Sequence, residues 1–255
     1  MGVVNITPDS FSDGGQFFAR DAAIAHARRL AAEGAHIIDI GGESTRPGAA
    51  PVSEDEELAR ILPALEALPD VCVSVDTRRP AVMRAALDAG ASMINDVQAL
   101  QASGALEAVR ESQCAVCLMH MKGEPATMQR DPHYDDVVRE VKDFLRQRVA
   151  AAEAAGIARE RIVVDPGFGF GKTAAHNLTL LGHLAEFGDL GVPLVAGLSR
   201  KSTIGRLTGR PADERLAGSL AMALIAAQRG ATILRVHDVK ETRDVIAVWE
   251  ALIGT

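Results

Sequence analysis

The sequence predicts a single-domain α/β protein with a (β/α)8 TIM-barrel architecture. The chain has 255 residues, 47% of them apolar, which is enough for one large core. Short runs rich in β-branched residues recur along it, and stretches with helical periodicity lie between them. Alternating strand and helix signals indicate a parallel sheet, and eight repeats of that alternation favour a closed barrel. An open, doubly wound sheet is the alternative that this pattern leaves open.

The predicted strands are continuous apolar runs rather than alternating ones, which is typical of strands buried on both faces. They are expected at Gly2–Ile6, Ala35–Ile40, Val71–Val75, Ala91–Asn95, Ala115–Met119, Arg161–Asp165, Pro193–Gly197 and Thr232–Val236. The clearest helices are predicted at Asp21–Glu33, Glu54–Leu68, Ala81–Ala89, Tyr134–Ala155 and Asp213–Gln228. The chain shows no linker and no repeat at the sequence level, so residues 1–255 are expected to form one domain.

The predicted helix ends carry recognisable signals. Ser53 is expected to cap a helix, with Glu56 completing a capping box. Glycines stand where four helices are expected to end, just before a strand begins: Gly34, Gly90, Gly156 and Gly230.

Composition excludes several classes of function. The net charge is −7 and no basic arm is present, so nucleic acid is not an expected partner. The start of the chain does not have the pattern of a signal peptide, and no apolar stretch is long enough for a membrane span. Cys72, Cys114 and Cys117 lie in apolar runs and are predicted to be core residues rather than redox or zinc sites; their odd number fits a reducing cytoplasm.

The most informative feature is that a polar group stands at or just past the end of every predicted strand. In chain order these groups are Asn5, Asp39 with Glu43, Thr45 and Arg46, Asp76, Asn95 with Asp96, His120, Asp165, Ser199 with Arg200 and Lys201, and Arg235 with His237. In a (β/α)8 barrel the carboxyl ends of the strands meet at the face that carries active sites. We therefore expect these side chains to form one site.

The strand-end groups divide into two chemistries. Arg46, Arg235 and His237, with Asn5 and Lys201, suit an anion such as a diphosphate, which Arg recognises through paired hydrogen bonds. A second group, Asp76, Asn95 and Asp165, suits a heterocycle that presents several N–H donors. The sequence thus predicts a cationic half and an anionic half. For His120, a wall position and a ligand contact both remain open.

Two glycine-rich segments resemble known motifs, but each lacks a glycine that its motif requires. Gly167–Thr173 resembles a phosphate-binding loop, yet Pro166 stands where that motif needs its first glycine. Gly197–Lys201 begins like a nucleophile elbow, but Lys201 occupies the position of its second glycine. Neither segment supports a nucleotide-binding or serine-hydrolase function.

Taken in order, the motifs resemble those of the dihydropteroate synthases over nearly the whole chain. The matching segments are Asn5–Gly15, Gly41–Ala49, Ser74–Thr77, Ile94–Asp96, Cys117–Met121, Asp165–Lys172, Ser199–Ser202 and Arg235–Val239. The family usually carries a further segment before the first strand, so the resemblance implies that this sequence lacks an N-terminal extension. Such a loss would affect the end of the barrel opposite the site.

The resemblance implies condensation of 6-hydroxymethyl-7,8-dihydropterin diphosphate with p-aminobenzoate, giving 7,8-dihydropteroate and diphosphate. The pterin would be held by Asp165, Asn95, Asp76 and Met119, with Lys201 on its carbonyl or ring nitrogen. The diphosphate would be bound by Thr45, Arg46, Arg235 and His237, with Mg²⁺ held through Asn5. The p-aminobenzoate slot would be formed by Phe11, Pro47, Phe170 and Ser202. The groups that act during the reaction would be Arg235, His237, Lys201 and Asp13.

The resemblance also implies a homodimer. The apolar segment Leu216–Ala227 fits either packing on the barrel or a subunit contact. Two other functions are carried as alternatives. A methyltetrahydrofolate-dependent methyltransferase of the pterin-binding barrel type would explain the anionic half but not the cationic one. A non-catalytic paralogue is disfavoured because the motif residues are present. Diphosphate release in the presence of both substrates separates all three.

Overall fold

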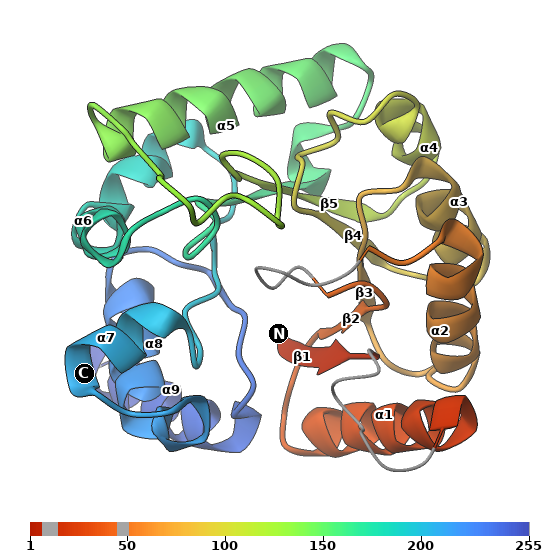
Figure 1. The fold of residues 1–255 in the computed structure, drawn as a ribbon, viewed down its shortest axis with the longest axis horizontal. Helices are drawn as coiled ribbons and strands as arrows, with labels where there is room; N and C mark the ends of the chain where they lie inside the picture. The colour runs from red at the N-terminus through yellow and green to blue at the C-terminus, as the bar shows by residue number, and fades with distance from the viewer. Residues whose placement is uncertain (7–14, 45–50, 255) are drawn as a thin grey trace.

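In the computed structural model, which describes residues 1–6, 15–44 and 51–254, parallel strands form a central ring that is surrounded by helices (Figure 1). The strands are β1 Gly2–Asn5, β2 Ile38–Gly41, β3 Val73–Asp76, β4 Met93–Asp96, β5 Ala115–Met119, β6 Ile162–Asp165, β7 Val195–Ala196 and β8 Ile233–Leu234. The α-helices are α1 Gly15–Ala32, α2 Glu54–Glu66, α3 Pro80–Asp88, α4 Ala105–Arg110, α5 Val137–Ala154, α6 Ala174–Gly182, α7 Ser202–Thr208, α8 Leu216–Gln228 and α9 Val239–Ile253. Short 3-10 helices occupy Arg159–Arg161, Leu184–Leu190 and Ala212–Glu214.

The ring of strands is closed, which excludes the open-sheet alternative. Strands β1 to β6 pair in chain order, all parallel, and β7 pairs with β8. A bridge between Val164 and Leu194 joins β6 to β7. On the other side, Gly2 bridges Val236, and the Val3 backbone N–H donates to the Val236 carbonyl at 3.0 Å. The predicted (β/α)8 barrel is therefore confirmed.

Every predicted strand is found, but most are shorter than the apolar run that predicted them. The largest difference is at β7 and β8, where the ladder covers two residues of each run. Beside it, the Thr232 hydroxyl accepts a hydrogen bond from the Leu194 N–H at 3.0 Å. A side chain thus takes part in a bond that a longer ladder would make through the backbone.

Helix ends follow local chemistry with one correction. Ser53 caps α2 by accepting from the Glu56 N–H at 3.2 Å, but the Glu56 carboxylate pairs with Arg60 instead of completing the predicted capping box. A capping box occurs instead at the start of α6, between Thr173 and His176. The predicted helix-ending glycines all adopt positive φ, a conformation that glycine tolerates well: Gly34, Gly90, Gly156 and Gly230.

The barrel interior is packed, as the layers of a (β/α)8 barrel require. Met93, Cys117, Val163 and Val195 form a buried cluster inside the ring. Cys114 is also buried, so two of the three cysteines are core residues as predicted. The same prediction for Cys72 is wrong, because this residue is exposed just before β3 begins.

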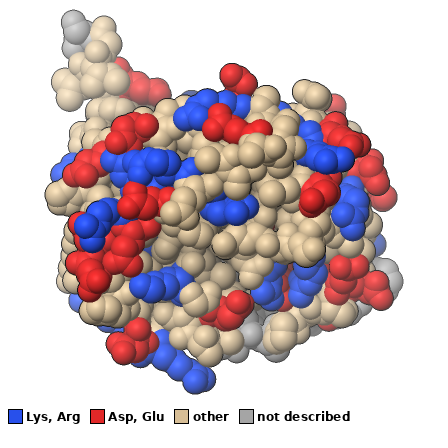
Figure 2. Space-filling model, turned by 90° about the horizontal axis from the view of Figure 1, so that it is seen from above, with Lys and Arg blue, Asp and Glu red and all other residues tan. Residues whose placement is uncertain are grey.

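The outer surface carries both signs of charge. Acidic and basic side chains are interspersed over the face shown in Figure 2. Among the described helices, none combines the length and the apolar character needed to cross a membrane.

Candidate active site at the carboxyl rim

The carboxyl rim is the end of the barrel where the parallel strands finish, and the predicted site residues that the structure describes lie there. Asn5, Asp76, Met119 and Asp165 end β1, β3, β5 and β6. Asn95 is the penultimate residue of β4, and Arg235 directly follows β8. Phe170, Lys201 and His237 lie in the connections that leave the strands, and Ser202 is the first residue of α7.

Five predicted site residues, Phe11, Asp13, Thr45, Arg46 and Pro47, lie outside the described residues. Their roles stay predictions.

Arg235 binds two carboxylates at the carboxyl rim. Its Nε donates to Asp39 Oδ2 at 2.6 Å, and a terminal nitrogen donates to Asp76 Oδ2 at 3.1 Å. The sequence analysis placed Arg235 and Asp76 in opposite halves of the site. The structure joins them: the partly buried guanidinium binds two carboxylates, and loss of any one partner would leave a buried charge uncompensated. The cationic and anionic halves are therefore continuous rather than separate.

This ion cluster shifts the protonation of its members. Burial, together with the neighbouring charge of Asp39, raises the pKa of Asp76 to about 7. Burial acts against the charge of Arg235 as well, yet Asp39 and Asp76 hold its pKa above the usual range. Near neutral pH the cluster thus has one permanent cation and a carboxyl group that titrates.

Asn95 presents an acceptor with no protein partner. Its Nδ2 donates to Asp39 Oδ2 at 3.3 Å, while its Oδ1 is buried and makes no hydrogen bond to the described residues. A buried acceptor without a donor is costly, so it marks a place where a ligand donor is favourable. This oxygen belongs to β4, beside the Asp76 position of β3.

Asp165 and Lys201 form the second part of the rim. One oxygen of Asp165 accepts from the Gly167 N–H at 2.7 Å, which orients the carboxylate. The Lys201 ammonium contacts the Phe168 carbonyl and lies 4.9 Å from the centre of the Phe170 ring. Burial raises the pKa of Asp165 and lowers that of Lys201 to about 8, and the attraction between the two charges opposes both shifts.

Two strand glycines stand beside these groups. A Cβ atom at Gly41 would lie 3.6 Å from Asp76 Cβ and 3.7 Å from Asn5 Oδ1. A Cβ atom at Gly197 would lie 3.8 Å from both Lys201 Nζ and Arg235 Cβ. Any longer side chain at either position would crowd the polar groups, so glycine keeps room beside them.

His237 is positioned by the neighbouring strand connection. Ser199 Oγ lies 3.2 Å from the His237 backbone N–H, which donates to it, and 3.1 Å from the ring Nδ1. Next along the chain, Asp238 pairs with Arg200, whose Nε donates at 3.0 Å. These contacts tie the residues before Lys201 to the residues that flank His237.

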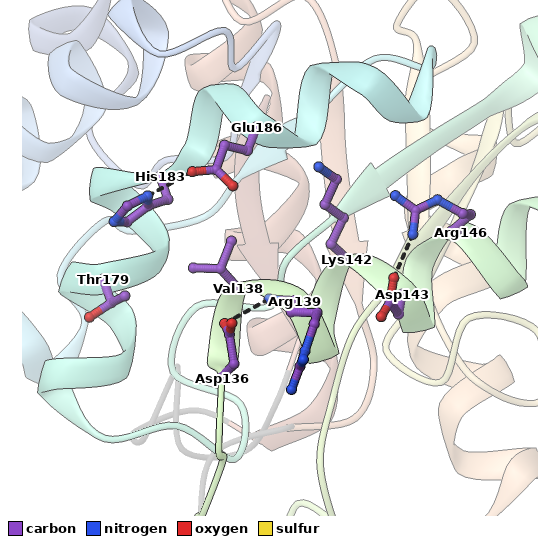
Figure 3. Close-up of a pocket in the computed structure, with 9 residues that line it drawn as sticks. All are labelled: Asp136, Val138, Arg139, Lys142, Asp143, Arg146, Thr179, His183 and Glu186. Carbon is purple, nitrogen blue, oxygen red and sulfur yellow. Dashed lines mark hydrogen bonds and ion pairs between the residues drawn. The ribbon is translucent and has the colours of Figure 1, made fainter.

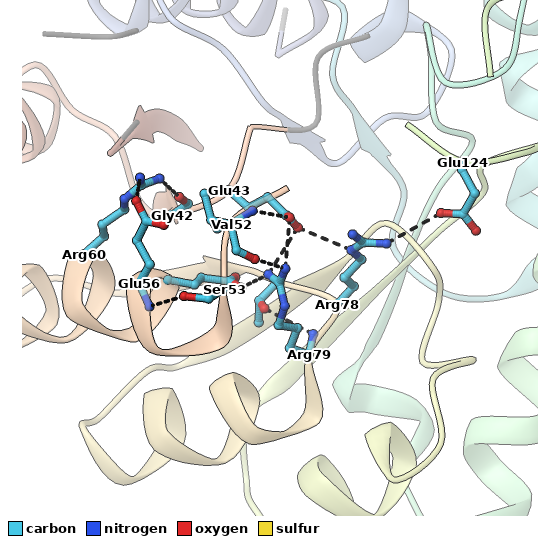
Figure 4. A network of polar contacts seen from close by, with 11 residues as sticks. Gly42, Glu43, Val52, Ser53, Glu56, Arg60, Arg78, Arg79 and Glu124 are labelled. Carbon is cyan, nitrogen blue, oxygen red and sulfur yellow. Dashed lines mark hydrogen bonds and ion pairs between the residues drawn. The ribbon is translucent and has the colours of Figure 1, made fainter. Parts of the chain in front are cut away.

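A polar network holds together the two described ends of the segment between β2 and α2 (Figure 4). Arg79 donates to Glu43 Oε1 at 3.0 Å and to the Val52 carbonyl at 2.6 Å. It also pairs with the buried carboxylate of Glu57. Arg78 joins the network through Glu43 at 3.3 Å.

The described residues contain no cluster of three or more His, Cys, Asp or Glu side chains that could hold a metal. A magnesium ion bound to a diphosphate needs few protein ligands, because phosphate oxygens and water complete its shell. Asn5 supplies a hard amide oxygen at the end of β1, next to the Asp76 position. Among the described residues, this donor chemistry fits a metal that arrives with an anionic substrate better than a preformed carboxylate cage.

A cavity of about 530 Å³ lies outside the barrel, among α5, α6 and the Leu184–Leu190 helix (Figure 3). Its charged groups are largely paired with one another or with neighbours. Lys142 lies 2.6 Å from Asp189, and His183 Nδ1 lies 2.7 Å from Glu186. Because it contains none of the rim residues, this cavity is not the candidate active site.

Sequence reasoning missed two functional positions. Asp39 was noted only as a strand-end residue, although it orients both Arg235 and Asn95. Arg79 received no role, because nothing in its local sequence indicates contacts with Glu43 and Val52. A carboxylate inside an otherwise apolar run was the available signal for Asp39, since a buried charge implies a partner.

These features define an enzyme class: a (β/α)8 barrel with a polar, ion-paired site at its carboxyl rim. Residues 1–237 match the family described as pterin binding enzyme. The dihydropteroate synthase of Escherichia coli K12 is 53% identical over 257 residues, covering 100% of this chain and 91% of the relative.

Solved structures of dihydropteroate synthases are also similar to this chain. A Xanthomonas albilineans dihydropteroate synthase with 4-aminobenzoic acid has a TM-score of 0.95 and 56% identity, covering 100% of this chain and 93% of the other. A complex of that enzyme with 7,8-dihydropteroate has a TM-score of 0.92, 54% identity and the same coverage. The chain belongs to the pterin-binding enzyme family and, within it, to the dihydropteroate synthases, which are transferases of folate biosynthesis.

Proposed function

We propose that the carboxyl rim joins a 6-hydroxymethyl-7,8-dihydropterin diphosphate to p-aminobenzoate, releasing diphosphate. The C–O bond to the diphosphate breaks with its electron pair on oxygen, and the aniline nitrogen forms the new C–N bond and then loses a proton. The observation that carries the proposal is that Asp165, Lys201, Arg235 and Asp76 stand at one end of the barrel, with Arg235 bound to Asp76.

The pterin is assigned to the acceptors of the rim. Asp165 has one oxygen fixed by Gly167, which leaves the other to accept from the amino-pyrimidinone edge. The unpartnered Oδ1 of Asn95 offers a further acceptor. Lys201 is assigned to the pterin carbonyl or a ring nitrogen. A carboxylate at this position also favours the positive charge that develops on the ring as the leaving group departs.

The leaving diphosphate is assigned to the cationic residues. Arg235 and His237 follow β8, and Thr45 and Arg46 are proposed to join them. Charge neutralisation on the leaving oxygen is the main demand, so catalysis is largely electrostatic and positional. Magnesium held through Asn5 would supply further neutralisation of the diphosphate.

The p-aminobenzoate is assigned to a slot of Phe170, Ser202, Phe11 and Pro47. Phe170 is half-buried beside the Lys201 ammonium, so its ring can pack against an aromatic substrate. The aniline nitrogen is already nucleophilic. No residue is assigned as a general base.

We also propose a cytoplasmic homodimer. Leu216, Ala217 and Ala221 of α8 are exposed, as is Leu207 of the contacting helix α7, and apolar surface of this kind favours a subunit contact. The cysteines are free thiols, which is compatible with a reducing compartment. Light scattering on the purified protein tests the dimer, and a monomer at micromolar concentration would overturn it.

The decisive experiment measures diphosphate release with each substrate omitted in turn. Release that needs both substrates and is lost in Asp165→Asn supports the proposal. Methyl transfer from methyltetrahydrofolate without diphosphate release would replace it with the methyltransferase function. Pterin binding with no turnover would indicate a non-catalytic paralogue.

A further inference from the structure

Lys172 is a lysine that the proposed reaction leaves unused, and it is almost completely buried, with 2% of its surface exposed. It follows the Gly167–Gly171 segment that connects β6 to α6. Its Nζ lies 2.9 Å from the Gly167 carbonyl, 3.0 Å from the Phe170 carbonyl and 2.9 Å from Nδ1 of His120. A lysine buried this deeply needs all of its donors satisfied.

The number of close acceptors matches the charged form. An ammonium has three donors, and three acceptors lie within 3.0 Å of Lys172 Nζ. Burial lowers the pKa of Lys172 well below its usual range, and Asp165 opposes that shift. Burial, together with the charge of Lys172, lowers the pKa of His120 to about 2, so the imidazole stays neutral and Nδ1 accepts. The contact set therefore fits a cationic Lys172.

The Gly167–Gly171 segment is held by side chains at each carbonyl oxygen. Lys172 binds those of Gly167 and Phe170, and Lys201 binds that of Phe168. Outside these two lysines, Gln129 donates to the Gly169 carbonyl and the Tyr134 hydroxyl donates to the Gly171 carbonyl at 2.9 Å. A segment with this many fixed carbonyls has little freedom to change shape.

Close packing against the end of β5 adds to this constraint. A Cβ atom at Gly167 would lie 1.8 Å from the His120 carbonyl oxygen, and one at Gly171 would lie 2.2 Å from the Lys122 carbonyl oxygen. Both glycines also have positive φ. The segment thus lies directly on the backbone that follows β5, and Lys172 contacts both, through His120 and through the Gly167 and Phe170 carbonyls.

We propose that Lys172 is a positioning residue for pterin binding: its ammonium holds the Gly167–Gly171 segment so that Asp165, Phe170 and Lys201 keep one relative geometry. The link to Asp165 is the Gly167 N–H, and the link to Lys201 is the Phe168 carbonyl. The ligand in this inference rests on the proposed function, whereas the positioning itself rests on the contacts.

The inference also predicts an electrostatic signature. The charged groups that act on Asp165 are Lys201, Arg235 and Lys172, all cationic, and each lowers its pKa against the effect of burial. Cys117 also faces Asp165, with its thiol pKa raised well above the usual value by burial and by that carboxylate. Removing Lys172 takes away one of three cations, so the pKa of Asp165 rises further. A neutral Lys172 would not contribute to this pKa, so the shift reports the charge of Lys172, while the affinity reports the geometry of the segment.

The test measures binding of 6-hydroxymethylpterin by calorimetry as a function of pH, in the full-length protein. Lys172→Met keeps the length and apolar stem of the side chain but removes the charge and all donors. We expect affinity near neutral pH to fall at least tenfold, and the acid limb of the binding curve to move to higher pH. The matched control is Lys142→Met, which removes a largely buried ammonium paired with Asp189 outside the barrel and should change neither quantity.

A second variant separates geometry from charge and serves if Lys172→Met does not fold. Tyr134→Phe removes only the hydroxyl that binds the Gly171 carbonyl, so we expect roughly fivefold weaker pterin binding with no shift of the acid limb. Wild-type affinity and an unshifted limb in the folded Lys172→Met protein would overturn the inference, as would wild-type affinity in Tyr134→Phe should Lys172→Met not fold. Failure of the wild-type protein to bind the pterin would instead overturn the proposed function.

Discussion

The Nε of Arg235 lies 2.6 Å from Oδ2 of Asp39, a carboxylate with no exposed surface inside the barrel. Asp39 lies two residues before the end of β2, one level deeper than Asp76 at the end of β3. The buried carboxylate holds one edge of the guanidinium, and one terminal nitrogen donates to Asp76 at 3.1 Å. Asp39, which lies deeper in the barrel than Asp76, therefore orients Arg235 before any substrate binds.

Two substitutions of Arg235 distinguish the effect of its positive charge from the effect of its planar guanidinium geometry. Arg235→Lys keeps the cation, but one ammonium cannot reproduce the planar fork that reaches Asp39 and Asp76 together. We expect turnover, measured as diphosphate release, to fall at least tenfold with the fold retained. Arg235→Ala should lose at least as much turnover and also about 3–5 kcal/mol of unfolding free energy, because it leaves the buried Asp39 carboxylate without its cation. Near-wild-type turnover in either variant would refute the assignment.

Replacing Asp165 tests the pterin edge. Asp165→Asn keeps an oxygen that can accept from the Gly167 N–H, so the fold should survive. It replaces the other acceptor with an amide donor, which mismatches a ligand edge rich in N–H groups. Calorimetry should show no measurable pterin binding, while circular dichroism and thermal unfolding stay close to wild type. Unchanged pterin affinity would count against the role of Asp165.

The pKa of Asp76 leads to a dependence of stability on pH. It is raised from 3.8 to about 7, so between these values the folded protein keeps a proton that the unfolded chain has released. The free energy of unfolding therefore falls as pH rises through this window. Asp76→Asn removes the titrating group, so the variant should gain Tm relative to wild type as pH is raised from about 4 to about 8.

Pterin affinity should be measured on the same Asp76→Asn variant, because the substitution also alters the Asp76 carboxyl group of the proposed site. We expect weaker pterin binding near pH 8 alongside the gain in relative Tm. A Tm difference between variant and wild type that does not change with pH would contradict the raised pKa. Asp70, an exposed acidic residue before β3, provides the control variant Asp70→Asn.

The network around Arg79 predicts strong coupling with Glu57, whose side chain is 1% exposed. Removing Arg79 leaves a buried carboxylate without its cation, so Arg79→Met should lower the unfolding free energy by about 3–5 kcal/mol. Adding Glu57→Gln to that variant should recover part of the loss. Urea denaturation of both single variants and the double variant measures the coupling. Strictly additive losses would exclude a direct interaction.

The same substitution should affect catalysis separately. Arg79 joins Glu43 to Val52, the described ends of the segment that carries Thr45 and Arg46 in the sequence. If those two residues bind diphosphate as proposed, Arg79→Met should weaken binding of the two ligands unequally. The fold-increase in KM for the pterin diphosphate should exceed the fold-increase in Kd for a pterin without phosphates. Equal effects on both ligands would argue against this link.

The sequence by itself determined the barrel and the location of its site. Continuous apolar runs separated by helical stretches report burial on both faces, and a parallel ring brings all carboxyl ends of its strands to one side. Asp76, Asp165 and Arg235 could thus be assigned to one rim without coordinates. The motifs then indicated the family, because the residue types and their order are local properties of the chain.

Only the tertiary structure decided how these groups share their charges. Arg235 pairs with Asp39 across 196 positions of sequence, Arg79 joins both ends of another strand connection, and Lys172 binds backbone carbonyls of a third. Local patterns indicate which residues are buried, and even this indication fails at Cys72, which is exposed although it lies in an apolar run. Which polar groups meet inside the barrel depends on ring closure and register, and these are set by contacts between distant segments.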